Sequence, residues 1–522
     1  MAFVKPVWFV HPHLYLLFSN YTSLTPASSL HSLTAASCRE NNRNNITTTG
    51  FQGSSLYPVS RGSLELKDLF SIMSEINSID LLRGWPSAEL LPTSILDEAS
   101  SRVLKDSALS TPSLSYGDEP GYEPLRKSIA IWLSQHFGTP WTVQERICIS
   151  GGASQNLACI LQVFTDPSYT RNVYIVAPTY HLVCRIFEDN GFVGRLRAIP
   201  EDDEGVDVAY LEASLAKHNE EGHGSNLKAR KRPQVAQKHY KNIIYTVPTF
   251  SNPSGRTTSL DRRRELVRLA RKYDALIIAD DIYDFIHWNS TSTSLSPPFI
   301  PRIVDIDHVL DGGPTTSFGN AISNASFSKI LAPGLRTGWT EATPTFIRGL
   351  SQCGSSVSGG APSQFVASII AQTLMNGTLQ NHIERVLIPS FKRRYQVVLS
   401  AIQRYLLPLG VVLEGKVEES MQGGYFVYFL LPPCILAKQF VLRAWEDEAV
   451  LVADGDIFEV HGDEDAVPAR HGVRICFAWE QENLLSEGLR RLGKVLANML
   501  EPESCVVIGR EAVDGKFLES KI

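Results

Sequence analysis

The chain has 522 residues, of which 43% are hydrophobic and 20% are charged, and its formal net charge is −6. This length exceeds what one hydrophobic core usually serves, so we expect two or three domains of ordinary globular composition. A net negative charge gives no reason to expect nucleic-acid binding. The sequence contains no run of 18 apolar residues, so we expect no membrane span.

The eight cysteines are scattered, with no CxxC pair and no histidine cluster at zinc spacing. This pattern predicts reduced thiols in a reducing compartment, and neither a disulfide framework nor a metal site. The cysteines are Cys38, Cys148, Cys159, Cys184, Cys353, Cys434, Cys476 and Cys505.

The first 62 residues differ from the rest, because they are rich in Ser, Thr and Asn and contain no acidic residue before Glu40. A transit peptide would carry more arginine, and a signal peptide would need an apolar run that Pro6 and Pro12 do not interrupt. We therefore predict a disordered or targeting extension over residues 1–62.

The compartment that we expect is the cytoplasm. The chain ends in Ser520, Lys521 and Ile522, which is close to the Ser-Lys-Leu peroxisomal signal, so a peroxisomal or mitochondrial location stays open.

From residue 63 onward the pattern is that of folded protein. Short apolar runs alternate with helical patterns, which is typical of an α/β fold with a mainly parallel sheet covered by helices on both faces. We expect strands over residues 173–177, 243–247 and 275–279 and in the run that ends at Ser328, with helices over residues 153–164, 181–190 and 260–273. The last helix has a capping signal at Ser259, and Arg262 and Arg263 are expected on its polar face. Ligands of such sheets bind beyond the carboxyl ends of the strands.

Two polar stretches, residues 217–241 and 289–323, interrupt this pattern and are expected to be surface insertions. The first contains a basic cluster at residues 228–233, for which a solvated loop is favoured over a nuclear import signal.

After Trp339 the pattern changes to that of a smaller α+β domain. We expect a long helical stretch over residues 363–407, strands over 424–431 and 473–478, and a helix over 435–447. The expected division is an N-terminal arm and part of the small domain over residues 63–110, a large domain over 111–345, a small domain over 346–503, and a tail over 504–522.

The most informative stretch runs from Ser326 to Trp339 and places Lys329 between small hydroxyl residues, with Arg336 seven positions later. A lysine in such surroundings can form a Schiff base with an aldehyde cofactor, and the nearby serine and arginine can hold a phosphate. The stretch therefore predicts a covalently held cofactor at Lys329.

A glycine-rich turn from Gly151 to Gln155 joins an expected strand to a helix. Free N–H groups and the helix dipole make such a turn an anion site, although the turn alone is a weak signal.

Asp280 ends an apolar strand, and Asp281 follows it. A carboxylate beside a pyridine nitrogen keeps that nitrogen protonated, so the ring can accept electrons. Helix capping is the alternative for Asp280, and the presence of Lys329 favours the cofactor role. We expect Asp281 to be solvated or to pair with a loop.

Two further residues fit a flat cofactor. Tyr180 follows a strand and can stack on a pyridine ring, although a half-buried core tyrosine is the alternative. Asn252 lies in the turn of residues 250–255, and turn formation explains Pro253 and Gly255 but not Asn252.

These motifs, in this order over roughly residues 75–500, resemble the class I/II aminotransferases, which are pyridoxal-phosphate enzymes of fold type I. The similarity is nearest to the kynurenine/2-aminoadipate aminotransferase branch, which favours large or aromatic substrates. The resemblance implies a large domain with a mainly parallel sheet plus a smaller α+β domain, and the cofactor pyridoxal 5′-phosphate. It implies catalytic roles for Lys329, Asp280 and Tyr180, and cofactor contacts by Ala153, Ser154, Gln155, Tyr180, Asn252, Asp280, Tyr283, Ser326, Lys329 and Arg336.

The resemblance also implies roles outside the cofactor motif. Arg474, in a strand-like segment, matches the arginine that binds the substrate α-carboxylate, and Gly84 matches a segment that closes over the substrate together with Asn252. Tyr116 matches a tyrosine that reaches the phosphate in the partner subunit, so a homodimer follows. The family often has Pro-Gly before the pocket segment near Phe458, and this chain has Asp454 and Gly455 there. That departure leaves the substrate side-chain pocket undefined.

The sequence therefore predicts transamination between an amino acid and a 2-oxo acid, in amino acid metabolism or biosynthesis, without a metal. The enzyme alternative is a pyridoxal-phosphate-dependent lyase of the 1-aminocyclopropane-carboxylate synthase or carbon–sulfur lyase type, since the same residues serve both reactions. A cofactor-binding regulator is disfavoured, because no helix-turn-helix pattern precedes the fold. The amino donor, the acceptor and the pathway stay open.

Overall fold

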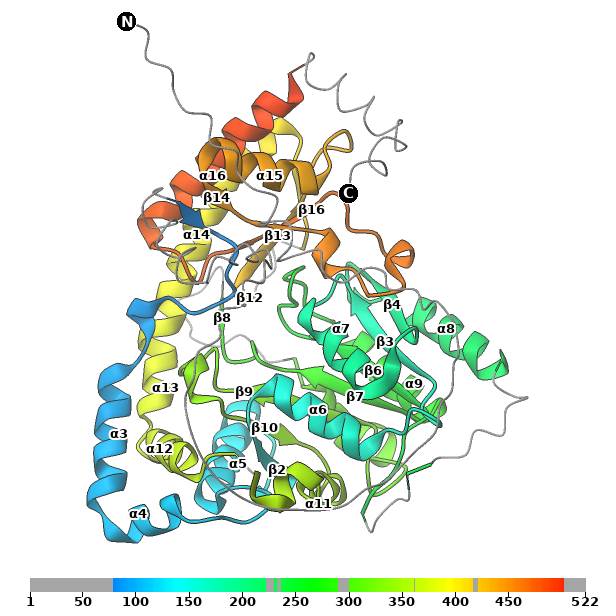
Figure 1. Cartoon of the computed structure of the whole chain (residues 1–522), viewed down its shortest axis with the longest axis vertical. Helices are drawn as coiled ribbons and strands as arrows, with labels where there is room; N and C mark the ends of the chain where they lie inside the picture. Colours follow the sequence, from blue (N-terminus) through cyan, green and yellow to red (C-terminus); the bar gives the residue numbers. More distant parts are fainter. Residues whose placement is uncertain are drawn as a thin grey trace, which may run out of the picture. The chain divides into compact units, whose positions relative to one another are not determined.

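A computed structural model describes residues 78–221, 230–231, 236–289, 300–360, 362–415 and 421–501. The predicted extension over residues 1–62, the tail over 504–522 and most of the basic cluster lie outside these residues. Figure 1 shows the arrangement of the elements.

The centre of the larger part is an eight-stranded sheet in the order β2-β10-β9-β7-β6-β3-β4-β5. Strands β4, β3, β6, β7 and β9 pair in parallel, and β10 is antiparallel to both β9 and β2. The mainly parallel sheet of the prediction is confirmed. The strands are β2 (Ile147–Ser150), β3 (Asn172–Ala177), β4 (Leu196–Asp202), β5 (Gly205–Val206), β6 (Asn242–Thr246), β7 (Ala275–Asp280), β9 (Ala321–Ser326) and β10 (Gly338–Glu341).

The central strands of this sheet are buried on both sides, because helices cover both of its faces. In β3, Val173 and Ile175 point into one hydrophobic cluster, whereas Tyr174 and Val176 point into another on the opposite face. The first cluster takes in α5 (Glu123–Phe137), α6 (Ala153–Phe164), α7 (Leu182–Phe187) and α11 (Pro344–Ser351), and the second takes in α8 (Val208–Glu221), α9 (Leu260–Lys272) and α10 (Ile303–Val309).

The smaller part contains a four-stranded sheet in the order β11-β13-β16-β15, in which the pairs are antiparallel. Its core is shared with α14 and α16, which pack against each other, and with α15, which contacts α16 (Figure 1). A parallel pair, β1 with β14, and an antiparallel pair, β8 with β12, complete the described strands. The bounds are β1 (Ile79–Asp80), β8 (His287–Asn289), β11 (Val412–Leu413), β12 (Met421–Gly423), β13 (Phe426–Leu430), β14 (Val450–Leu451), β15 (Ala453–Asp454), β16 (Gly472–Cys476), α15 (Ala437–Glu448) and α16 (Glu482–Leu500).

The stretch predicted to be helical over residues 363–407 is helical for most of its length, but it is divided into several helices. Gly377 has φ +70° and separates α12 (Gln364–Met375) from α13 (Thr378–His382). The chain then passes through a π-helical turn into α14 (Ile388–Tyr405). Glycine takes a left-handed conformation without steric cost, so the break falls there. Two further helices, α3 (Thr93–Lys105) and α4 (Ser107–Leu114), pack against α12.

Two further details differ from the expectations. Ser259 does cap α9, since its side chain accepts a hydrogen bond from the Arg262 amide, but Arg263 is buried and donates to the Pro248 and Thr258 carbonyls. The stretch over 289–323 is not wholly a surface insertion either, because α10 within it is largely buried.

Candidate functional site

Asp280 ends β7 at the carboxyl edge of the large sheet, paired in register with Asn324 of β9. One carboxylate oxygen, Oδ2, accepts a hydrogen bond from the Tyr245 hydroxyl at 2.7 Å, and the other, Oδ1, is buried without a partner among the described residues. Burial raises the pKa of Asp280 to about 6, and this rise is opposed by the Tyr245 hydrogen bond and by the charge of Lys329. A buried carboxylate with one free oxygen is suited to a cationic partner that the chain itself does not supply.

Lys329 lies three residues beyond β9, and its Nζ donates to the Gly84 carbonyl at 2.5 Å. Loss of hydration lowers the pKa of Lys329 to about 8; Arg474 acts in the same direction, and Asp280 opposes it. The Nζ also lies 5.2 Å from the centre of the Tyr425 ring. A lysine amine in this environment is neutral for part of the time near neutral pH, which a nucleophile and proton carrier requires.

The glycine-rich turn begins α6, where Gly152 is the N-cap with φ +96°. A Cβ on Gly152 would lie 2.7 Å from Arg336 Nη2, so a larger residue would push the guanidinium away. Arg336 donates to the Gly151 carbonyl at 3.2 Å. The first N–H groups of a helix, here those of Ala153 and Ser154, have no partner within the helix, so arginine and amides together form an anion site.

Three other predicted site residues, in β9, in α6 and after β3, lie near this anion site. Ser326 is the last residue of β9, and its hydroxyl oxygen accepts from the Ser328 amide at 3.1 Å. Gln155 is exposed on the first turn of α6, where its Oε1 accepts from the Gly151 amide at 3.0 Å. Tyr180 is half-buried, and burial raises the pKa of its hydroxyl.

The opposite side of the site is formed by the small sheet. Arg474 in β16 is buried, donates to the Asn252 side chain at 3.0 Å and to the Leu82 carbonyl at 2.5 Å, and its Nε has no partner among the described residues. Its guanidinium lies 4.2 Å from the Phe426 ring centre and 4.9 Å from that of Phe458. A buried arginine between two aromatic rings, with a free N–H, can bind a carboxylate.

The two remaining predicted residues, Gly84 and Tyr283, both lie beside the ring of Phe426. A Cβ on Gly84 would lie 2.7 Å from its Cζ, so this close approach requires glycine. Tyr283 is also buried, with its ring 6.2 Å from Phe426 and 5.6 Å from Tyr425.

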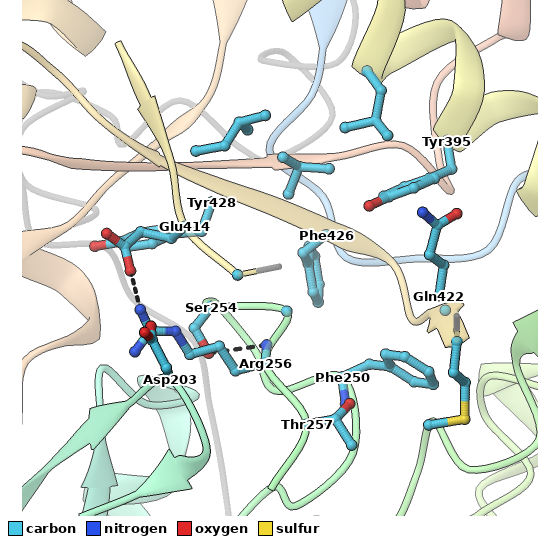
Figure 2. A pocket seen from close by; sticks show the side chains of 17 residues that line it. Asp203, Phe250, Ser254, Arg256, Thr257, Tyr395, Glu414, Gln422, Phe426 and Tyr428 are labelled. Carbon is cyan, nitrogen blue, oxygen red and sulfur yellow. Dashed lines mark hydrogen bonds and ion pairs between the residues drawn. The ribbon is translucent and has the colours of Figure 1, made fainter. Parts of the chain in front are cut away.

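The turn that carries Asn252 is fixed from the side of the small sheet as well. Arg256 forms an ion pair with Glu414, next to β11. Figure 2 shows this pair at one end of a cavity of about 60 Å³ that Phe426 also lines. The large part and the small sheet therefore meet in this region through Arg256–Glu414 and through Asn252–Arg474.

Tyr116 stands apart from this group. Its side chain is 91% exposed, and the ring lies close to Gly359, where a Cβ would be 3.1 Å from Tyr116 Cε1. Such an exposed tyrosine is available to a second chain.

Several site residues were missed by the sequence reasoning. Tyr245 and Phe426 lie within apolar strands, where no local pattern distinguishes them from core residues. A buried network was missed too, in which Asn156 Nδ2 donates to Asn324 Oδ1 at 2.7 Å and Asn324 donates to the Ala153 carbonyl at 3.0 Å. Asparagines in apolar segments were the available signal for this network.

Asp281 corrects an expectation. It is buried with both carboxylate oxygens unpartnered in the part of the chain that the structure describes, and is neither solvated nor a surface loop partner. Burial raises its pKa well above the usual value, and Asp284 adds to the rise. The charged form of Asp281 is therefore disfavoured beside Asp280 at this strand end.

The described residues fit pyridoxal phosphate. The unpartnered Asp280 oxygen suits a protonated ring nitrogen, Lys329 suits an aldehyde, and the α6 turn with Arg336 suits a phosphate. Over these same ranges, no group of three or more His, Cys, Asp or Glu side chains is placed to hold a metal ion. In the described part of the chain, none of the helices is both long and apolar enough to cross a membrane.

Comparisons with known proteins agree with this geometry. The family model for aminotransferase class I and II matches residues 88–492. An uncharacterised protein of Saccharomyces cerevisiae is 36% identical over 74% of this chain and 89% of its own length. The aromatic-amino-acid aminotransferase 1 of Thermococcus litoralis is 30% identical over 83% of this chain and 91% of its own length.

Among solved structures, the Pyrococcus horikoshii kynurenine aminotransferase superposes with a TM-score of 0.67 at 27% identity. The match covers 85% of this chain and 96% of that one, which was crystallised with the amino form of the cofactor and with kynurenine. The predicted fold type is confirmed by this likeness.

Proposed function

Because the chain belongs to the aminotransferase class I and II family and is a pyridoxal-phosphate-dependent aminotransferase, we propose that Lys329, Asp280 and Arg474 carry its transamination. Amino acids and 2-oxo acids are the substrates of this family, and the lyase alternative finds no support in the comparisons. The observation that carries the assignment is the buried, unpartnered Asp280 oxygen close to a lysine whose pKa is lowered to about 8.

Pyridoxal phosphate, when bound, supplies a ring that takes up the electron pair released as the substrate α-carbon loses its proton. Lys329 accepts that proton as a base and returns it as an acid, for which its lowered pKa is suited. When the cofactor is bound, Asp280 would hold negative charge against the ring nitrogen, and Tyr180 would stack on the ring. Asn252 and Tyr283 would hold the ring oxygen by hydrogen bonds.

The phosphate group is proposed to bind where the anion site lies. The residues that hold it are Ala153, Ser154, Gln155, Ser326 and Arg336, which bring together a helix N-terminus, hydroxyl groups and one arginine. The substrate α-carboxylate binds Arg474, whose guanidinium offers two parallel N–H groups to a carboxylate. Gly84 and Asn252 complete that side of the substrate site.

Large or aromatic amino acids are the proposed amino donors. Phe426 and Phe458 flank Arg474, so aromatic side chains lie beside the proposed position of the substrate carboxylate. The similar enzymes named above act on aromatic amino acids and on kynurenine, respectively. The test is a panel of twenty amino acids plus 2-aminoadipate and kynurenine, each paired with 2-oxoglutarate and assayed for both products. Equal rates for alanine and for phenylalanine would contradict the assignment.

The same assay separates transamination from the lyase reaction. A transaminase turns over the amino donor only while an oxo acid is present. Without an acceptor, a carbon–sulfur lyase releases a thiol, ammonia and a 2-oxo acid, and a 1-aminocyclopropane-carboxylate synthase consumes its donor without releasing ammonia. Release of ammonia at the rate of donor consumption, with no second amino acid formed, would replace the proposed reaction.

We also propose a homodimer in which Tyr116 contacts the phosphate in the partner's site. Its 91% exposure in the single chain leaves the ring available to a second chain. Mixing Lys329→Ala with Tyr116→Ala chains tests this directly. Each hybrid dimer then has one site with Lys329 and an intact tyrosine from its neighbour, so activity should rise above that of either parent. No rise after confirmed subunit exchange, or a monomer in solution, would rule the arrangement out.

The cytoplasm is the proposed compartment, because the six cysteines among the described residues are all free thiols, including the exposed Cys434. Fluorescent fusions at either end of the chain test this.

A further inference from the structure

Two thiols lie directly behind the anion site, on the far side of Gln155. Cys159 is one helical turn after Gln155 on α6, and its Sγ accepts a hydrogen bond from Gln155 Nε2 at 3.0 Å. The same Gln155 side chain accepts from the Gly151 amide, so the sulfur and the anion site share one side chain. A change at Cys159 therefore reaches Gln155 through a direct contact.

The second thiol, Cys353, comes from a segment about 190 residues later. It follows α11, and its Sγ lies 3.4 Å from the Ser355 hydroxyl, which is 3.8 Å from Cys159 Sγ. Both sulfurs therefore converge on the Ser355 hydroxyl. Two sulfurs that share one such neighbour, on segments far apart in sequence, are arranged as a pair that a disulfide could join.

The surroundings of the pair make the two thiols unequal. Interaction with the Cys159 thiol and hydrogen bonds from Ser355 lower the pKa of Cys353, whereas interaction with Cys353 and burial raise the pKa of Cys159. Lys231, one of the two described residues of the basic cluster, donates to the Gln162 and Thr165 carbonyls near the end of α6 and places a positive charge near Cys353. Cys353 is thus the thiolate of the pair and Cys159 the thiol that can react with its oxidised form.

Access and mobility also favour reaction at this pair. Both sulfurs are buried, but Gly354 and Ser355 next to Cys353 are exposed. A Cβ on Gly354 would meet no atom within 4 Å, so this part of the backbone has room to shift as the two sulfurs approach bonding distance.

We propose that Cys159 and Cys353 form a reversible disulfide modification site at the back of the phosphate-binding turn. In the oxidised state the Gln155 side chain is released from Cys159. The expected weakening of cofactor binding rests on the proposed role of that turn in holding the phosphate. The chemical agent is hydrogen peroxide, a small oxidant that can reach a shallow buried thiol.

The reaction balances in two steps. The Cys353 thiolate attacks one peroxide oxygen, the O–O bond breaks, and the leaving hydroxide takes up a proton to give water and a sulfenic acid at Cys353. Cys159 then loses its proton and attacks that sulfur, which displaces the hydroxyl group as a second water. Two thiols are oxidised by two electrons, one peroxide is reduced to two waters, and a dithiol such as dithiothreitol reverses the change.

The experiment treats the cofactor-loaded full chain with hydrogen peroxide, blocks the remaining thiols with an alkylating agent, and maps disulfide peptides by mass spectrometry. We expect a Cys159–Cys353 cross-link that dithiothreitol removes. The oxidised protein should bind cofactor roughly tenfold more weakly, as expected for one lost hydrogen bond to a charged group. Cofactor affinity is measured by titration after removal of peroxide.

Three variants serve as controls. Cys353→Ser should give no cross-link and should keep its cofactor affinity after peroxide, because serine cannot form the disulfide while the Ser355 contact remains available. Cys434→Ser removes an exposed thiol, and Cys184→Ala removes a buried thiol outside the pair. Both variants should still form the Cys159–Cys353 cross-link and should still bind the cofactor more weakly after peroxide. The proposed disulfide site would be overturned if Cys159 and Cys353 were recovered as free thiols while Cys434 is oxidised. The proposed effect on the phosphate-binding turn would be overturned if the cross-link formed but cofactor affinity did not change. The cross-link is read independently of turnover, so failure of the proposed catalytic roles would appear separately, as a reduced protein without transaminase activity.

Discussion

The two sides of the site are held in different ways. On the side of the large sheet, Asp280 and Ser326 are the last residues of adjacent parallel strands, so the hydrogen-bonded sheet fixes their spacing. On the other side, Gly84 lies outside regular structure and is positioned by side chains: Lys329 donates to its carbonyl, and Phe426 occupies the space that a Cβ would need. The cofactor side is therefore rigid through its backbone, whereas the substrate side depends on packing and can differ between relatives.

Removal of Lys329 from the cofactor side is expected to have the largest effect. Lys329→Ala loses both the nucleophile and the proton carrier, so kcat should fall by on the order of 10⁴-fold or more, while circular dichroism shows an intact fold. Lys272→Ala, which removes an exposed lysine paired with Glu212, is the control and should leave kcat unchanged. Substantial transaminase activity in Lys329→Ala would remove this lysine from the mechanism.

Asp280→Asn tests the charge beneath the ring position. The amide keeps the shape but cannot hold negative charge, so kcat should fall by roughly 10²–10⁴-fold, while some cofactor binding remains. Asp311→Asn, at an exposed ion pair with Arg268, serves as the surface control. A rate within twofold of the wild type would exclude Asp280 from the mechanism.

The difference between the two sides also explains what the sequence could predict. Residues at strand ends, such as Asp280 and Lys329, interrupt apolar runs and so are visible in the sequence, and the parallel order of the strands follows from the alternation of elements. Tyr245 and Phe426 have the same local pattern as core residues, because their roles come from partners distant in sequence. Arg263 was misplaced for a related reason, since its hydrogen bonds to buried carbonyls depend on tertiary packing.

Arg474→Lys weakens the substrate side without removing its charge. Lysine cannot offer two parallel N–H groups to a carboxylate, so kcat/KM should fall by about a hundredfold, in line with the roughly 1.5–3 kcal/mol of a hydrogen bond to a charged group. The loss should be mainly in KM, and cofactor affinity should stay close to that of the wild type. Arg393→Lys, whose arginine is exposed and pairs with Glu482, is the matched control. A mutant that loses cofactor affinity instead would place Arg474 on the cofactor side of the comparison.

Tyr245→Phe makes the finest distinction, because it removes one hydrogen bond and leaves both sides of the site otherwise intact. The Tyr245 hydroxyl donates to Asp280 Oδ2 and opposes the rise of the carboxyl pKa to about 6. Without that bond the charged form is less stable, so the pKa of Asp280 rises further, and the acid limb of the pH–rate profile should move to higher pH. At neutral pH kcat should fall roughly twofold, because the loss of about one such bond raises the pKa of Asp280 by about one unit, and the deficit should shrink as pH rises and Asp280 becomes fully ionised. Tyr240→Phe is the control, since this buried hydroxyl donates to the Gly319 carbonyl and makes no contact with Asp280. A uniform loss at every pH would mean that Tyr245 only packs against the sheet, and the rigidity of the cofactor side would then rest on the strands alone.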